Sequence, residues 1–190
     1  MGLTVTVPDV LPVTLEQQKQ QSRITHDGED TLIRSHIRAA TNWCQAFQAR
    51  QYISATYVLT LPILHDPIEI PRSPLVSVTS ITYTDTAEAS QTLATSEYTV
   101  ITSDDMSPRI VQAYGKTWPA TLPVDEAVTV TFVAGYGATA ATVPDDIQHA
   151  IRLLAAHFYE NREAVITGTV SKEVELSVKA LLWSDRAVNV

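Results

Sequence analysis

Apolar side chains recur every three or four residues near both ends of the chain and every second residue in between. The clearest helical stretch is VPDDIQHAIRLLAAHFYENR, residues 143–162, which opens with Pro144 and two aspartates suited to a helix start. Its main apolar stripe is formed by Ile147, Ile151, Leu154 and Phe158. Leu153 and Ala156 lie outside that stripe. We therefore expect this helix to pack on its own fold with one face and on another molecule with the second.

Two helices are predicted before residue 50. Thr14 and Gln17 form a capping-box pattern for a first helix that ends near Arg23. Thr25 or Asp27 is the expected cap of a second helix over about residues 29–50. Its apolar side is predicted to hold Leu32, Ile33, His36, Ile37, Ala40, Trp43, Cys44 and Phe47. Its polar side is predicted to hold Arg34, Arg38, Thr41, Gln45 and Gln48. The second helix is thus strongly amphipathic.

A last helix is predicted over residues 171–183, after a break at Thr167-Gly168. Its apolar side comprises Val174, Val178, Leu181 and Leu182. A short tail, residues 184–190, follows it.

The middle of the chain is predicted to form strands. Eight of the ten prolines lie from Pro62 to Pro144, where they would break long helices. Residues alternate between apolar and polar in short runs around 57–61, 68–70, 76–83, 98–100, 109–111 and 128–132. The alternation changes phase at Thr79–Ser80, which predicts a bulge, and residues 84–91 form a polar connection. Many threonines favour an antiparallel sheet with one wet face.

The order of these elements predicts an α+β fold. Four helices in two pairs form a small helical domain, and an antiparallel β-rich region is inserted between the pairs. The predicted boundaries are 1–55 for the N-terminal arm and first helix pair, and 56–140 for the β-rich region. Residues 141–183 form the second helix pair, and 184–190 the C-terminal tail.

Composition limits the chemistry that the chain can perform. A net charge of −8 argues against nucleic acid as a tightly held ligand. The single cysteine, Cys44, excludes an internal disulfide and suits synthesis in a reducing cytoplasm. His149 and His157 are too far apart along a helix to bind one metal ion, and His36 is expected in the core. We expect no metal, no cofactor and no membrane partner.

The sequence also lacks a recognisable catalytic motif. No G-x-S-x-G elbow is present, and Gly135-Tyr136-Gly137 is interpreted as a plain turn rather than a nucleotide-binding loop. Glu160 and Glu163, beside Arg162, are interpreted as a solvated or intersubunit charge cluster. An enzyme that uses His26 and neighbouring acidic residues is kept as a minor alternative.

Several segments together resemble the head-to-tail connector (adaptor) family of long-tailed bacteriophages and gene transfer agents. The similar segments are THDGEDTLI (25–33), PRSPLVSVTSITYTD (71–85), PRIVQAYGKTWP (108–119), VTVTFVAGYG (128–137) and AHFYENRE (156–163). The resemblance extends over about residues 15–183. It implies a helical domain with a β-rich insertion, and a structural role in the virion neck rather than an enzymatic one.

The resemblance also implies partners. Family members form a ring, usually of twelve copies, under the portal protein, extend the DNA channel, and dock the stopper or tail-completion protein. DNA would pass without specific binding. The C-terminal helix and tail of relatives contact the portal, which here implies Leu181, Leu182, Trp183 and Arg186. The second face of the 143–162 helix predicts a subunit interface at Leu153, Ala156, Glu160 and Arg162. The main alternative is a stopper or tail-completion protein of the same neck.

Overall fold

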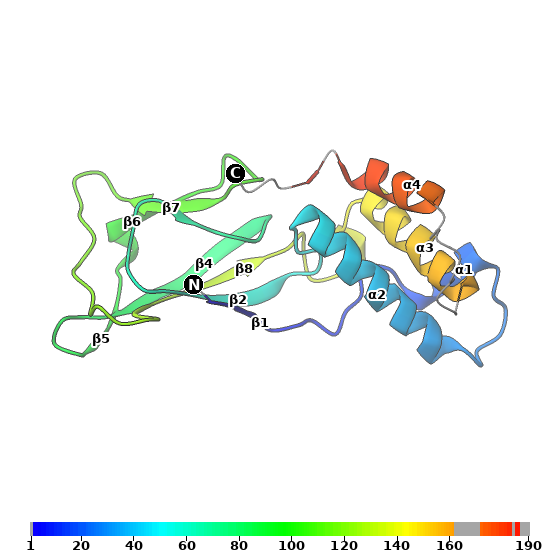
Figure 1. The fold of residues 1–190 in the computed structure, drawn as a ribbon, viewed down its shortest axis with the longest axis horizontal. Coiled ribbons are helices and arrows are strands. Elements are labelled where there is room, and N and C mark those ends of the chain that lie inside the picture. Colours follow the sequence, from blue (N-terminus) through cyan, green and yellow to red (C-terminus); the bar gives the residue numbers. More distant parts are fainter. Residues whose placement is uncertain (1, 162–171, 184, 187–190) are drawn as a thin grey trace. The chain divides into compact units, whose positions relative to one another are not determined.

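The chain folds into two compact units in a computed structural model, which describes residues 2–161, 172–183 and 185–186. A β unit comprises residues 2–8 and 54–136, and a helical unit comprises residues 9–53 together with the described part of 137–186. Figure 1 labels the elements of both. Helices and antiparallel sheets are both present, so the predicted α+β class is confirmed.

Four helices from the two ends of the sequence build the helical unit. They are α1 (Leu15–Ser22), α2 (Asp30–Gln48), α3 (Asp145–Glu160) and α4 (Lys172–Trp183). Helix α3 packs against the other three, as the orange ribbon in Figure 1 shows. Its first turn carries Asp145 and Asp146, and its buried side chains include Ile147, Ile151 and Leu154. The stretch with the strongest helical pattern is therefore the centre of this unit.

Helix α1 begins as the sequence predicts. Thr14 Oγ1 accepts a hydrogen bond from Gln17 N at 3.2 Å, and Gln17 Oε1 accepts one from Thr14 N at 2.8 Å. These two bonds form a complete capping box. The helix ends at Arg23, whose left-handed backbone (φ 55°) stops it.

Helix α2 differs from its prediction in its N-terminal cap and in the burial of two polar side chains. Its N-cap is Glu29, which makes no side-chain cap bond, so the predicted cap at Thr25 or Asp27 was wrong. Asp27 instead binds Lys19 Nζ at 2.6 Å. Thr41 and Gln48, assigned to the polar side, are buried. Thr41 satisfies its hydroxyl locally by donating to Ile37 O at 2.8 Å, which removes the cost of burying it. The predicted burial of Ile33, Ile37, Ala40 and Cys44 is confirmed.

Helix α4 buries Val178 and Leu182 completely, and Val174 and Leu181 partly, as the apolar pattern predicts. The predicted break at Thr167-Gly168 lies outside the described residues.

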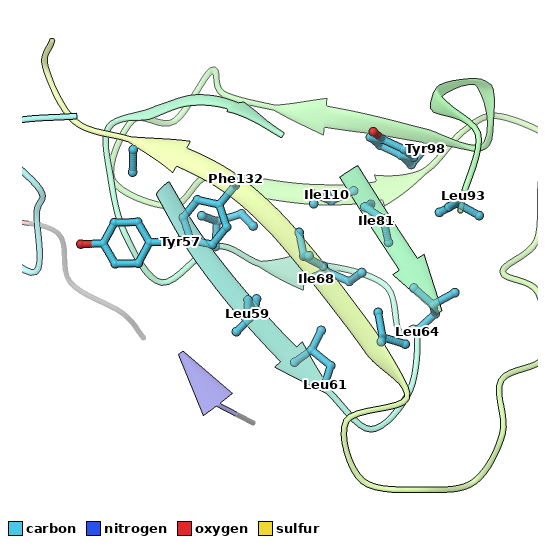
Figure 2. Close-up of a cluster of buried hydrophobic side chains, with 14 of the residues drawn as sticks. Tyr57, Leu59, Leu61, Leu64, Ile68, Ile81, Leu93, Tyr98, Ile110 and Phe132 are labelled. Carbon is cyan, nitrogen blue, oxygen red and sulfur yellow. The ribbon is translucent and has the colours of Figure 1, made fainter. Parts of the chain in front are cut away.

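Two antiparallel sheets build the β unit. The larger sheet has the order β1-β2-β8-β4-β5, with β1 (Gly2–Val5), β2 (Ala55–Leu61), β8 (Val128–Ala134), β4 (Leu75–Thr84) and β5 (Ser90–Thr92). The smaller has the order β3-β7-β6, with β3 (Ile68–Glu69), β7 (Arg109–Gln112) and β6 (Tyr98–Ile101). Side chains of both sheets share one apolar core, which Figure 2 shows. Tyr57 and Phe132 stack within it, with ring centroids 5.3 Å apart.

Strand β4 contains the predicted irregularity. Its pairing with β8 shifts register between Val78 and Ser80, which confirms the bulge at Thr79–Ser80. A second shift between Leu75 and Ser77 was not predicted, and it leaves Val76 exposed.

Strands β1 and β5 were not predicted. All three residues of β5 are exposed, as are Leu3 and Val5 of β1, so neither strand shows a buried apolar alternation. Both lie at the edges of the larger sheet, where main-chain pairing with a single neighbouring strand holds them in place of a buried apolar face. Pairing of β1 with β2 groups residues 2–8 with the β unit, whereas the sequence suggested grouping this arm with the first helix pair.

The turn between β4 and β5 is organised by Asp85. Its carboxylate accepts hydrogen bonds from Gln91 Nε2 at 2.9 Å, Ala89 N at 3.0 Å and Ala87 N at 2.9 Å. The bond from Gln91, then those from the backbone, hold the pKa of Asp85 below its ordinary value. Because the pKa of Asp85 is lower in the folded than in the unfolded protein, its carboxylate stabilises the fold at any pH above the unfolded-state pKa. This stabilisation is lost as the pH falls through the pKa of the folded state.

We therefore expect Asp85→Asn to lower the urea midpoint of the β unit at pH 7, and the difference from the native protein to shrink towards about pH 3. Urea unfolding at both pH values measures it. Glu88→Gln in the same turn is the control, because it removes a carboxylate from this turn and keeps the three hydrogen bonds to Asp85. A constant difference at both pH values would contradict the role of the ionised carboxylate.

Candidate interaction surfaces of the helical unit

A buried arginine joins the end of α2 to the beginning of the C-terminal tail. Helix α2 stops at Ala49 (φ 56°), and the chain turns so that Arg50 is 1% exposed. Arg50 Nε donates to the main-chain oxygen of Asp185 at 2.6 Å, and its Nη2 lies 2.9 Å from Asp185 Oδ1. A buried guanidinium requires such a partner, since an unpaired charge is costly inside a protein. The first residues of the tail are thus fixed to the helical unit.

Gln48 provides a second link to α4. Its Nε2 donates to Leu182 O at 2.9 Å, and its Oε1 accepts from the Tyr52 hydroxyl at 2.7 Å. The bond satisfies one of the last carbonyls of α4, which have no partner within the helix. This explains why Gln48 is buried despite the polar-side prediction. Sequence periodicity gave no signal for this role, because a glutamine at the edge of an amphipathic stripe usually faces water.

Aromatic side chains surround this junction. Trp43 and Phe47 of α2 stack in parallel, with centroids 5.6 Å apart, and Phe47 lies 6.4 Å from the Trp183 ring. The Arg186 guanidinium carbon lies 4.9 Å from the Phe47 centroid and 5.6 Å from that of Trp183. We call these four residues the aromatic end surface. Trp183 is 65% exposed, which is unusual for so large an apolar side chain and is typical of contact surfaces.

The four residues implied as portal contacts do not have equal access to a partner. Trp183 is exposed, and Leu181 and Arg186 are half-buried. Leu182 is completely buried within the helical unit. It can hold α4 against the rest of the helical unit, but its side chain cannot touch another protein in this conformation.

The second face of α3 is partly open. Leu153 and Ala156 are half-buried, and Glu160 is exposed at the end of the helix. Exposed His149 lies one turn before Leu153 on the same face. Arg162, the fourth predicted interface residue, lies outside the described residues. Two apolar side chains are thus flanked by polar ones along this face, which resembles the apolar centre and polar rim of a protein interface.

Candidate catalytic and ligand groups are not brought together. Within the described ranges, no group of three or more His, Cys, Asp or Glu side chains is placed to hold a metal ion. Cys44 is buried, which raises its pKa to about 12 and keeps it as an unreactive thiol. His26 is exposed in the α1–α2 connection, and His36 packs near the rings of Phe158 and Tyr159. No described helix is both long and apolar enough to cross a membrane.

The glycine turn also lacks the geometry of a nucleotide site. Gly135 and Gly137 have φ values of 138° and 159°. A 3-10 helix, η2 (Ala140–Thr142), follows before α3 begins at Asp145. A Cβ on Gly137 would lie 2.5 Å from Thr142 Oγ1, so this glycine is required by close packing.

These features define an α+β assembly protein, whose outward apolar surfaces are suited to contacts with other chains. Residues 12–114 match the sequence profile of the phage gp6-like head-tail connector protein family. The chain belongs to this family, and its role is that of a structural connector. A comparison with curated proteins found no match.

Solved structures are similar over the whole chain. A chain from the virion of a native gene transfer agent (GTA) particle is 26% identical, with a TM-score of 0.81. A chain from the neck of an empty GTA particle, computed with C6 symmetry, is 27% identical, with a TM-score of 0.80. One from the neck of a native GTA particle, computed with C12 symmetry, is 27% identical, with a TM-score of 0.76. Each alignment covers 100% of this chain and 97% of the other.

Proposed function

We propose that the chain forms a ring in the neck of a phage-like particle, where it joins the portal to the stopper or tail and performs no catalysis. The observation that carries the proposal is the full-length similarity to GTA virion and neck chains at a TM-score of up to 0.81. The sixfold and twelvefold symmetry of those necks supports a ring of twelve copies, since six divides twelve.

Neighbouring copies would meet through the second face of α3. In a closed ring each copy presents two different surfaces, so an apolar face that its own fold leaves partly open is suited to the contact. Leu153 and Ala156 would provide the apolar centre, and Glu160 with Arg162 the charged rim.

The C-terminal end would face the portal. Leu181, Trp183 and Arg186 would make the contacts, while buried Leu182 holds α4 in place beneath them. The bond from Gln48 and the ion pair with Arg50 support this assignment, because they hold the end of α4 and the tail in one position before binding.

DNA would pass through the ring without specific binding. The net charge of −8 provides no general attraction for phosphates, whose neutralisation by Lys and Arg drives non-specific binding. An acidic connector thus suits a channel through which DNA must slide.

Imaging of particles that carry a tagged version of this chain tests the position. We expect extra density in a ring directly under the portal. Density one ring lower would identify the chain as a stopper or tail-completion protein, and absence from purified particles would overturn a neck role.

The ring interface is tested by Leu153→Glu. We expect the variant to fold as the native chain does but to enter particles in greatly reduced amounts, because a charge would replace the apolar centre of the contact. Ala39→Glu, at an exposed position of α2, is the matched control. Circular dichroism checks folding, and quantitative gel analysis of particles measures incorporation. Normal incorporation of Leu153→Glu would exclude this face from the ring.

A further inference from the structure

Two opposite charges lie next to each other at the start of the tail, but only one is neutralised. The Asp185 carboxylate pairs with buried Arg50 at 2.9 Å. Arg186 has no carboxylate partner among the described residues, and its main-chain N–H donates to Trp183 O at 3.4 Å. The carboxylate of its sequence neighbour, Asp185, is thus already paired with Arg50. The end of the helical unit therefore presents a positive charge, although the whole chain is acidic.

The Arg186 side chain is also held in place. Its guanidinium lies over the faces of Phe47 and Trp183, at distances within the range of cation–π attraction. Trp43 extends the apolar surface by stacking on Phe47. Stacking restrains the flexible side chain but leaves the edges of the guanidinium, with their N–H donors, available for hydrogen bonds.

We propose that the aromatic end surface is a carboxylate-recognition site, in which Arg186 binds an Asp or Glu side chain that the partner protein presents beside apolar residues. The partner is the portal, so the inference rests on the proposed function and deepens it. The occupant follows from charge complementarity: a guanidinium with no carboxylate partner among the described residues fits a carboxylate from another chain, and the rings around it fit apolar neighbours.

The site includes two residues of α2, which were not among the four portal contacts implied by the family resemblance. Phe47 and Trp43 lie more than 130 positions before Arg186 in the sequence, and only the docking of α4 on α2 brings them to it. Phe47 makes the shorter of the two contacts with the guanidinium. It is therefore expected to orient Arg186 as well as to touch the partner.

Binding of the full chain to purified portal rings tests the proposal. Biolayer interferometry at low and high salt would compare the native chain with Arg186→Gln, Arg186→Lys, Arg186→Glu and Phe47→Leu. We expect Arg186→Gln to weaken binding by about tenfold to a hundredfold and to reduce its salt dependence, since a desolvated charge pair is lost. Arg186→Lys should recover only part of the affinity, because an ammonium cannot form the two parallel bonds of a guanidinium. Arg186→Glu should bind most weakly.

Lys179→Gln is the matched control, because Lys179 is a cation on α4 that pairs with Glu175 on the helix itself. Its affinity should stay within about twofold of native. Equal affinity and equal salt dependence of the native chain and Arg186→Gln would overturn carboxylate recognition while leaving portal binding intact. Failure of the native chain to bind portal rings at all would instead overturn the proposed portal contact, and this inference with it.

Discussion

Replacing Arg50 by alanine is expected to destabilise the helical unit by about 3 kcal/mol, through loss of a buried ion pair and creation of a cavity. Arg50 is among the largest fully buried side chains of the described chain. Without it, Asp185 loses the two contacts that Arg50 makes with its main-chain oxygen and its carboxylate. We therefore expect both a lower free energy of unfolding and a tail that proteases cut more readily.

Two further variants separate packing from charge. Arg50→Met keeps most of the side-chain volume, so it should recover part of the lost stability, as apolar replacements of buried ion pairs often do. Lys179→Ala removes an exposed pair with Glu175 and should change stability by about 0.5 kcal/mol or less. Urea unfolding in a Trp118→Phe background would report on the helical unit, because the remaining tryptophans, Trp43 and Trp183, both lie in it. Equal midpoints for Arg50→Ala and the native chain would show that the buried pair contributes nothing.

Replacing Phe132 by alanine is expected to cost the β unit about 3–5 kcal/mol. Phe132 is completely buried in β8, stacks on Tyr57 of β2, and lies opposite Val78 in β4. Its ring thus lies in the shared core on the central strand (Figure 2), and a closely packed core compensates only partly for the space that alanine would leave. A loss of this size approaches the whole stability of many small units.

The matched control for Phe132 is Val133→Ala, on the same strand but on the opposite, half-exposed face. It should cost about 1 kcal/mol or less, because far less apolar area is removed from contact. A background with Trp43→Phe and Trp183→Phe leaves Trp118, which packs against the β core, as the reporter of this unit. Similar losses for the two variants would mean that the core does not depend on the stacked pair.

Features that depend on neighbouring residues, such as helix caps, helix faces and bulges in strands, could be predicted from the sequence. The capping box at Thr14, the amphipathic stripe of α2 and the bulge near Thr79 each depend on residues close together in the chain, so their patterns carry the information. Strands β1 and β5 were missed because edge strands with exposed side chains lack that pattern. The cap of α2 was misjudged because Asp27 has a stronger partner in Lys19, eight residues away.

The candidate surfaces depend more on the tertiary structure. Trp183 and Arg186 could be named from the resemblance, but their access to a partner could not, and Leu182 is buried although it belongs to the same short segment. Neither Arg50 nor Phe47 gave a sequence signal for its role. Arg50 binds Asp185, which lies 135 positions later, and Phe47 contacts Arg186 of the tail. A local sequence pattern contains no information about contacts between residues so far apart in the chain.

The sequence by itself determined the α+β class, the pairing of helices from the two ends and the family of connectors. Periodicity and short motifs involve residues that are close together in the chain, so the sequence alone contains them. The tertiary structure alone decided which side chains of the C-terminal end are free. That choice follows from two buried polar groups at and just after the end of α2, Gln48 and Arg50, which must find partners inside the protein. By binding Leu182 and Asp185, they leave Trp183 and Arg186 on the surface.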